Sequence, residues 1–308
     1  MTVGKFTVKI GLNVAPGQPS DIAMSMLRDQ LDFEFNGKVE LQIFPSEQCG
    51  NELTMIESMR DGILEMIVTS TPPLGVLCPA FMVFDLPFIF PNSEIVDKLL
   101  DGPIGKEMAA NLANMNIAPL AWWSHGTRQI SNNCRPITDI EDLKNLKIRT
   151  MDNAIHKTYF SQLGAIPVPI ALSDLYLALE NKEVDAQETP LSIYMNNKYY
   201  SLQKYLTINE YVYTPALVLA NKEWFESLPS SLQKFIVKNV FDLRTFQRQV
   251  GREQTKAYLE KLRLAGVEIT LLNESKKKAF VEVANQIYPL FENQIGSQLL
   301  EKIRIHAV

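Results

Sequence analysis

"MIESMRDGILEMIVTS" (residues 55–70) and "LYLALENKEVDAQETP" (residues 175–190) repeat one arrangement at two distant places in the chain. In each stretch, apolar residues at helical spacing lead through a tight turn into a strand that carries an acidic residue. Strands and helices also alternate outward from both stretches. This alternation predicts an α/β protein built from two similar lobes.

Each copy is expected to hold five elements in the order strand, helix, strand, helix, strand. Ser20 and Ser173 are placed at helix starts, and Gly62 and Gly164 at helix ends, because serine favours the N-cap and glycine the C-terminal cap. The expected elements of the first copy are 6–14, 20–35, 38–45, 51–62 and 63–70. Those of the second copy are 146–150, 153–164, 166–170, 173–182 and 183–190.

The C-terminal third is expected to connect the lobes. Residues 213–228 are predicted to form a strand, a turn and a helix start, and residues 230–265 a long amphipathic helix that ends at Gly266. At 1.5 Å per residue, that helix is about 50 Å long, enough to span both lobes. We therefore expect two lobes that face a central cleft and are connected by hinge strands and this helix. Their expected residues are 1–124 plus 214–252 for the first lobe and 125–213 plus 253–308 for the second.

Composition and charge exclude several classes of protein. The 308 residues are 46% apolar and 21% charged, which is typical of a folded chain with room for two domains. The formal net charge of −5 argues against a surface for nucleic acid or anionic membranes. The longest apolar stretch, 74–91, is interrupted by Pro79, Asp85 and Pro87, so we predict buried strand and loop there instead of a membrane span.

The first residues lead directly into a strand and lack the pattern of a secretory signal peptide. Two explanations stay open: a cytosolic product, or a numbering that starts on a processed or recombinant chain. Cys49, Cys78 and Cys134 are widely spaced, odd in number and without a CxxC pair, so we predict three small buried side chains, with no zinc site and no disulfide framework.

The sequence lacks recognisable catalytic and cofactor motifs. His125, His156 and His306 are its histidines, and none lies in HExxH or beside a GxSxG elbow. No GxGxxG or Walker loop follows a strand. Asp185 and Glu188 fall on opposite faces of a short strand, so a paired general acid and base is not predicted. The pattern favours a binding protein with no catalytic residue, no metal and no cofactor.

Two other classes are weighed against a binding protein. A two-lobed enzyme would need turnover that depends on His125 or on an acidic residue. The effector-binding domain of a regulator would need a DNA-binding helix-turn-helix with a basic face, for which the chain has neither the space nor the charge.

Small polar residues and one arginine stand where the predicted strands end. Ligands of open α/β sheets bind beyond the carboxyl ends of the strands, so these residues are expected to line the cleft. They are Asn13, Ser70, Thr71, Arg149, Thr150, Glu188 and Thr189. Arg149, and Arg128 after the turn at Gly126, each present a planar fork that matches a carboxylate. The alternative is that both are ordinary surface or interlobe arginines.

Five stretches together resemble the DctP-type substrate-binding proteins of tripartite ATP-independent periplasmic (TRAP) transporters. They match that family in order and spacing over nearly the whole chain. They are "IFPSEQCGNELTMIESMRDG" (43–62), "GTRQISN" (126–132), "DLKNLKIRTMDN" (142–153), "GAIPVPIALSDLYLALENKEVDAQETP" (164–190) and "KEWFESLPSSLQKFI" (222–236).

The resemblance implies two α/β lobes that close over an organic acid and deliver it to a membrane pair of small and large subunits. It implies that Arg149 forms the salt bridge to the ligand carboxylate and that Arg128 adds a second cationic contact. It also places Asn13 and Ser70 in the cleft of the first lobe, and Tyr213 near the hinge. A periplasmic location and a monomer are expected on the same ground.

Three departures from the family's sialic-acid branch bear on the substrate. That branch has asparagine where this chain has Thr189, phenylalanine where it has Leu172, and glutamate where it has Ser70. We therefore expect a sugar acid such as a uronate instead of sialic acid, since Ser, Thr, Asn and Tyr side chains suit hydroxyl groups. A C4-dicarboxylate, keto or aromatic acid stays open, with Trp122 and Trp123 as a possible apolar wall.

Overall fold

The computed structural model describes residues 5–306. Residues 1–4, which belong to the N-terminal stretch compared above with a signal peptide, lie outside the described residues. The chain divides into two compact units. The first holds residues 1–73, 100–125 and 215–252, and the second holds 74–99, 126–214 and 253–308. The mixed α/β character of the chain confirms the predicted fold class.

The first unit is built on three parallel strands and one antiparallel neighbour. β1 (Phe6–Leu12) pairs in parallel with both β2 (Val39–Phe44) and β3 (Met66–Ser70), and β3 pairs antiparallel with the end of β8 (Tyr205–Asn221). The strand order is therefore β2-β1-β3-β8, with β4 (Ile117–Asn132) adjacent to β8. The helices are α1 (Pro19–Glu34), α2 (Glu52–Arg60), α5 (Pro103–Ala110), η2 (Ala113–Met115), α9 (Lys222–Ser227) and the first part of α10 (Ser230–Leu264).

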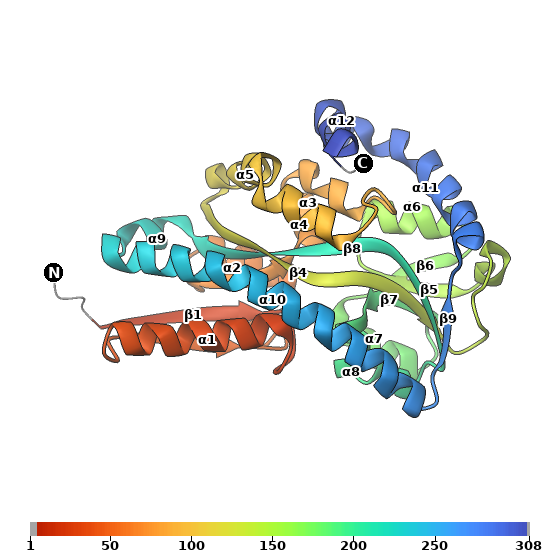
Figure 1. Cartoon of the computed structure of the whole chain (residues 1–308), viewed down its shortest axis with the longest axis horizontal. Coiled ribbons are helices and arrows are strands. Elements are labelled where there is room, and N and C mark those ends of the chain that lie inside the picture. Colours follow the sequence, from red (N-terminus) through yellow and green to blue (C-terminus); the bar gives the residue numbers. More distant parts are fainter. Residues whose placement is uncertain (1–4, 307–308) are drawn as a thin grey trace. The chain divides into compact units, whose positions relative to one another are not determined.

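One hydrophobic core holds the first unit together. Helix α1 lies along β1 (Figure 1), and its buried residues Ala23, Leu27 and Leu31 pack with the strand residues Val8 and Ile10. Helix α10 adds apolar residues at helical spacing to the same core, as the sequence predicts. The indole of Trp123 donates a hydrogen bond to the carbonyl of Val240, 3.1 Å away.

The second unit repeats the plan of the first. β5 (Lys147–Thr150) pairs in parallel with β6 (Ile166–Pro169) and β7 (Ala186–Pro190), and β7 pairs antiparallel with β4, giving the order β4-β7-β5-β6. β9 (Glu268–Leu271) pairs in parallel with the start of β8. Its helices include α6 (Ala154–Gln162), α7 (Leu172–Glu180), α8 (Leu191–Asn196), η3 (Ile140–Leu143), η4 (Tyr199–Ser201), α11 (Glu274–Ile295) and α12 (Ser297–His306).

Two long strands and the longest helix are among the segments that pass from one unit into the other. β4 and β8 are adjacent strands of 16 and 17 residues (Figure 1), and each has one end in either unit. The 35-residue helix α10 contributes residues 230–252 to the first unit and 253–264 to the second. It ends just before Gly266, whose φ of 83° is left-handed, in agreement with the predicted helix end.

The segment 74–99 differs from the sequence-based expectation in two ways. Within it, residues 74–91 are predicted as strand and loop, but α3 (Thr71–Leu77) and η1 (Pro79–Asp85) are helical; α4 (Ser93–Asp101) follows. The apolar run has no period that separates strand from buried helix, so the prediction was wrong. The segment also packs with the second unit instead of the first lobe, because Tyr288 donates to the carbonyl of Pro87 and Tyr213 donates to Asp97 at 2.6 Å.

Two helix starts and the cysteine prediction also need correction. Helix α1 begins at Pro19, because proline fits the first helical position, so Ser20 lies inside the first turn. Helix α7 begins at Leu172, and the hydroxyl of Ser173 faces Asp174 instead of capping the helix. Of the three cysteines predicted to be buried, Cys49 and Cys78 are half-buried and Cys134 is exposed.

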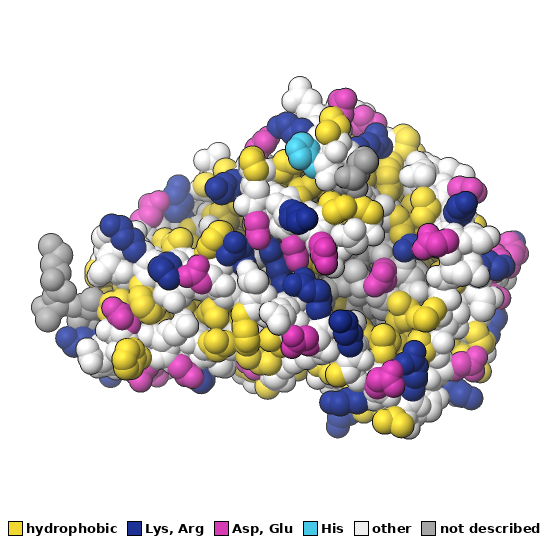
Figure 2. All heavy atoms as spheres, in the orientation of Figure 1, with side chains coloured by type: hydrophobic (Ala, Val, Ile, Leu, Met, Phe, Trp, Pro, Cys, Tyr) yellow, Lys and Arg dark blue, Asp and Glu magenta, His cyan; other side chains and the backbone are white. Residues whose placement is uncertain are grey.

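Charged side chains of both signs are mixed over the face of the molecule shown in Figure 2, in keeping with the modest net charge. Within residues 5–306 no helix combines the length and the apolar character that crossing a bilayer requires.

Candidate functional site

In the first unit, the polar residues at the strand ends gather around one carboxylate. Asn13 follows β1 and Ser70 ends β3, and these two strands are parallel neighbours. Oε1 of Glu52 accepts hydrogen bonds from Nδ2 of Asn13 at 2.8 Å, from the backbone N–H of Ser70 at 2.7 Å and from the hydroxyl of Thr69 at 3.0 Å. The structure thus brings Asn13 and Ser70 together, as the strand-end argument predicts.

This cluster keeps polar atoms for a further partner. Oδ1 of Asn13, Oγ of Ser70 and Oγ1 of Thr71 are buried and have no hydrogen-bond partner within residues 5–306. Buried polar atoms in native proteins are almost always hydrogen-bonded to protein, water or ligand. The cluster can therefore hydrogen-bond to a polar ligand at the carboxyl ends of β1 and β3.

In the second unit, strand register decides which residues share a face of the sheet. Arg149 on β5 pairs with Gln187 on β7, and side chains of one strand alternate between the two faces. Arg149 therefore shares a face with Gln187 and with Thr189 two residues further on. Arg149 is 2% exposed, and its Nε donates to the carbonyl of Ile170 at 2.8 Å, which fixes the plane of the guanidinium.

Two threonine hydroxyls lie at the same strand ends. Thr150 follows Arg149 on β5, and Thr189 lies in β7; both are buried. Neither Oγ1 atom has a hydrogen-bond partner among the described residues. Side chains alternate along a strand, so Thr189 shares the face of Arg149, whereas Thr150 points to the opposite face. The unit thus presents a fixed arginine fork with the hydroxyl of Thr189 on the same face, a combination suited to a carboxylate that carries hydroxyls.

The second predicted arginine lies on the opposite face of this sheet. Arg128 on β4 pairs in register with Pro190, and so shares its face with Glu188. Its guanidinium donates from Nε and Nη2 to the carboxylate of Glu188, with 3.0 Å from Nη2 to Oε1, and Nη2 also donates to the carbonyl of Glu188 at 2.8 Å. Arg128 and Arg149 are therefore not brought together on one face, and a ligand contact by Arg128 stays a prediction.

Glu188 belongs to a wholly buried group of ionisable residues. The hydroxyl of Tyr211 donates to its carboxylate, and the ring of His156 lies 3.6 Å from both Glu188 and Asp85. Burial acts to raise the pKa of Glu188, but Arg128 and then His156 hold that pKa well below its usual range. Within the described part of the chain, no set of three or more His, Cys, Asp or Glu side chains has the geometry to hold a metal ion.

Asp85 is the unusual member of this group. Burial raises the pKa of its carboxyl to about 6, against the lowering effects of His156 and of the hydrogen bond from Asn153. Nδ2 of Asn153 donates to Oδ2 of Asp85 at 2.7 Å, and Oδ1 of Asn153 caps the start of helix α6. Asp85 therefore ties the 3-10 helix η1 to the N-terminus of α6.

The last two predicted site residues lie elsewhere in the second unit. Tyr213 on β8 is 6% exposed and donates its hydroxyl hydrogen bond to Asp97. Leu172 begins α7, is half-buried and packs against a core cluster that contains Leu175 and Leu179. The unit by itself does not place Leu172 or Tyr213 against Arg149.

Sequence reasoning missed Glu52 and the role of Glu188. Glu52 stands at the first position of helix α2, where acidic residues are common because of the helix dipole, so nothing in the sequence marks it as a binding residue. Glu188 is expected from the sequence to line the cleft, and its pairing with Arg128 is not predicted. The sequence does hold one signal for this pair. Arg128 and Glu188 have opposite charges and each lies within a predicted strand, where a charged residue is seldom buried without a partner.

Comparisons with known proteins show the family of the chain. The family described as bacterial extracellular solute-binding protein, family 7 (DctP), matches residues 10–294. A crystal structure of the sugar acid binding protein DctPAm from Advenella mimigardefordensis strain DPN7T, in complex with galactonate, matches with a TM-score of 0.96 and 31% identity, covering 99% of this chain and 98% of that chain.

Two further relatives extend the comparison. A TRAP periplasmic solute binding protein from Roseobacter denitrificans, with bound β-D-glucuronate, has a TM-score of 0.92 and 26% identity and covers 97% of this chain and 99% of that chain. The 2,3-diketo-L-gulonate-binding periplasmic protein YiaO of Escherichia coli (strain K12) is 29% identical over 300 residues, 96% of this chain and 91% of that protein. The chain belongs to the DctP-type family of TRAP-transporter solute-binding proteins, family 7 of the bacterial extracellular solute-binding proteins.

Proposed function

We propose that this protein captures a sugar acid, such as a uronate, through a salt bridge between Arg149 and the ligand carboxylate. The observation that carries the proposal is the buried, oriented guanidinium of Arg149 on the same sheet face as Thr189. Arginine is the side chain best suited to a planar, bidentate contact with a carboxylate. The relatives that bind galactonate, glucuronate and 2,3-diketo-L-gulonate support the choice of a sugar acid.

Hydroxyl groups of the ligand are the second element of this proposal. Thr189 in the second unit, and Asn13 and Ser70 in the first, supply buried polar atoms that no described protein group engages. Such atoms pair well with the hydroxyls of a sugar acid and poorly with a purely apolar acid. Removing the ligand hydroxyls one at a time should therefore weaken binding stepwise.

Hinge closure of the two lobes over the ligand is also part of the proposal. The ligand would favour the closed state by contacting both lobes, and the carboxylate would exchange its water for the guanidinium on closure. The protein would then act in the periplasm as a monomer that delivers the acid to the small and large membrane subunits of a TRAP transporter. The family membership of the chain supports this assignment.

Thermal unfolding against a panel of acids tests the proposal. Purified, ligand-stripped protein would be heated with uronates, aldonates, sialic acid, C4-dicarboxylates, keto acids and aromatic acids, with neutral sugars as matched controls. At one hundred times Kd, a ligand adds about 2.7 kcal/mol to the free energy of unfolding. For 308 residues this raises the midpoint by roughly 4 °C, from about 2.1 cal/mol/K of unfolding entropy per residue.

We expect the largest shift with one stereochemical family of sugar acids and none with the corresponding neutral sugars. A larger shift with a C4-dicarboxylate, keto or aromatic acid would replace the sugar acid while keeping the carboxylate site. An equal shift with the neutral sugar would contradict the role of Arg149.

A further inference from the structure

A cavity lies entirely within the second unit. It has a volume of about 650 Å³ and is lined by the loop before α4, by β4, by β8 and by helix α11. Of the predicted sugar-acid residues only Tyr213 belongs to its lining; Arg149 and Thr189 do not. Cavities of 300–1,000 Å³ are the usual size of small-molecule sites.

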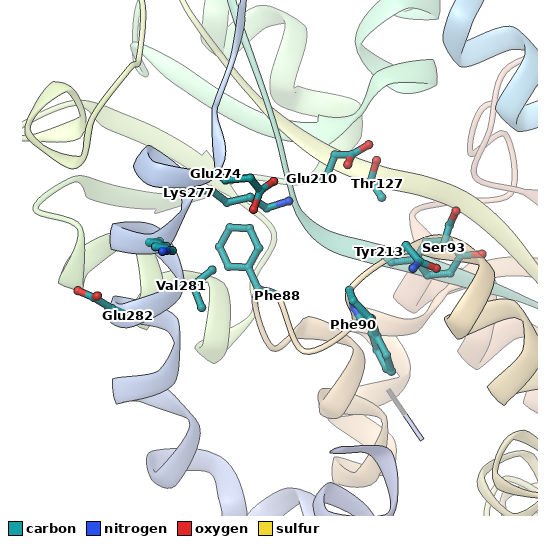
Figure 3. A pocket seen from close by; sticks show the side chains of 13 residues that line it. Phe88, Phe90, Ser93, Thr127, Glu210, Tyr213, Glu274, Lys277, Val281 and Glu282 are labelled. Carbon is teal, nitrogen blue, oxygen red and sulfur yellow. The ribbon is translucent and has the colours of Figure 1, made fainter. Parts of the chain in front are cut away.

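Three aromatic rings line this cavity. They are Phe88, Phe90 and Tyr213; in Figure 3, Phe88 and Phe90 project from the loop before α4, Phe88 lies beside Lys277, and Phe90 lies nearer to Tyr213. Nζ of Lys277 lies 5.7 Å from the centroid of the Phe88 ring. Rings so placed attract the face of a planar group and a nearby cation.

The lining also carries charges of both signs. Lys277 and Lys278 on α11 supply two cations, and Glu210, Glu274 and Glu282 supply three carboxylates. Figure 3 shows Lys277 and Glu274 along the same helix, with Glu210 on the neighbouring strand. A ligand with a single charge would meet like charge in this lining, whereas a zwitterion finds partners for both of its charges.

The backbone around the cavity is held in place by hydrogen bonds. Phe88 and Glu210 both have left-handed backbones, with φ of 58° and 50°. The N–H of Phe88 donates to the carbonyl of Tyr211 at 2.6 Å, and the N–H of Glu210 donates to Oε1 of Gln129 at 3.0 Å. Uncommon conformations of bulky residues persist only where the surroundings fix them, and they cluster at ligand sites. The lining is thus organised before a ligand arrives, which lowers the cost of binding.

We propose that this cavity is a second ligand site, separate from the sugar-acid site, and that it binds an aromatic amino acid. The aromatic ring of the ligand packs against Phe88 and Phe90. Its carboxylate pairs with Lys277, and its ammonium group with the glutamates of the rim. This proposal can be tested separately from the proposed sugar-acid function, because neither Arg149 nor Thr189 lines the cavity.

Calorimetric titration with three probes tests this site. L-Phenylalanine carries both charges, 3-phenylpropionate lacks the ammonium group, and phenethylamine lacks the carboxylate. Each partly exposed ion pair contributes up to about 1 kcal/mol, or about fivefold in affinity. We expect saturable binding of phenylalanine to wild-type protein, and binding about fivefold weaker for each of the two other probes.

Two variants and a matched control locate the binding. Lys277→Met keeps the side-chain length but loses the charge, and Phe90→Leu loses the aromatic face; each should weaken phenylalanine binding about fivefold. Lys276→Met changes the neighbouring lysine, which is outside the cavity lining and pairs with Asp139, and should leave the affinity unchanged. Unchanged melting curves would show that all three variants are folded.

Three results would overturn the proposal. The first is the absence of saturable binding of phenylalanine and tryptophan to the wild-type protein. The second is equal affinity for phenylalanine and 3-phenylpropionate, since the glutamates would then play no part. The third is phenylalanine binding that neither Lys277→Met nor Phe90→Leu weakens, because the amino acid would then bind elsewhere.

Discussion

Removal of the buried cation Arg128 should destabilise the protein strongly, because it leaves the carboxylate of Glu188 buried without its main partner. The side chain of Arg128 is 4% exposed and that of Glu188 is 0% exposed. Breaking a buried pair from one side costs about 3–5 kcal/mol, since the remaining charge stays desolvated. With about 0.65 kcal/mol/K of unfolding entropy for a chain of this length, Arg128→Met should lower the melting midpoint by roughly 5–8 °C.

The same structure predicts that removing both partners costs less than removing one. In the variant Arg128→Met/Glu188→Gln no unpaired charge remains, and the amide of residue 188 can still accept the hydrogen bond from Tyr211. We therefore expect the double variant to be more stable than Arg128→Met alone by about 1–3 kcal/mol.

Urea unfolding of the wild type, both single variants and the double variant forms a complete cycle for this pair. Arg28→Met is the matched control, because Arg28 is also in an ion pair but lies on the surface. It should change the free energy of unfolding by less than about 1 kcal/mol. The reasoning would be refuted if Arg128→Met lowered the free energy of unfolding by less than about 1 kcal/mol. It would also be refuted if the losses of the two single variants simply added in the double variant.

Three other substitutions probe separate features of the two units. Asp85→Asn should change the pH dependence of stability, because the folded-state pKa of Asp85 is raised to about 6 from 3.8. The free energy of unfolding of the wild type should therefore fall by up to about 3 kcal/mol as pH rises between these values, and that of the variant should not. Urea unfolding of both proteins from pH 4 to pH 7 measures this, and a stability difference that is constant with pH would contradict it. Glu52→Ala leaves three buried donors without their acceptor, so unfolding in urea should show a loss of about 2–4 kcal/mol, whereas exposed Glu57→Ala should lose under 1 kcal/mol. Asn51→Ala removes the side chain that caps helix α2 and should cost about 1 kcal/mol in the same assay, with Asn51→Ser restoring most of it; no change for Asn51→Ala would count against the cap.

The sequence predicts most elements of the fold because local signals agree with the final structure. The alternation in 146–150 and the glycine at 164 place strand β5 and the end of helix α6 within two residues of their observed bounds. The long helix α10 follows from its apolar spacing in the same way. Local signals fail over residues 74–91, where nearly every residue is apolar and no period distinguishes strand from helix.

The candidate site is only partly predictable, because it depends on register. That Arg149 and Thr189 lie near the ends of strands can be read from the sequence, and the structure places them on one face. That Arg128 belongs to the other face depends on how β4 aligns with β7, which no short stretch encodes. Glu52 acquires its contacts only when β1 and β3 become neighbours.

The most direct test of the central claim is the affinity of the protein for a sugar acid with and without the arginine fork. Calorimetric titration would compare wild type, Arg149→Lys and the control Lys147→Met, whose side chain is exposed on the same strand. Arg149→Lys keeps the charge but loses the bidentate geometry and the contact with Ile170. We predict an affinity at least about 100-fold lower for Arg149→Lys, from a loss of about 3 kcal/mol or more, and no change for Lys147→Met. Binding of the sugar acid by Arg149→Lys as tightly as by the wild type would contradict the account.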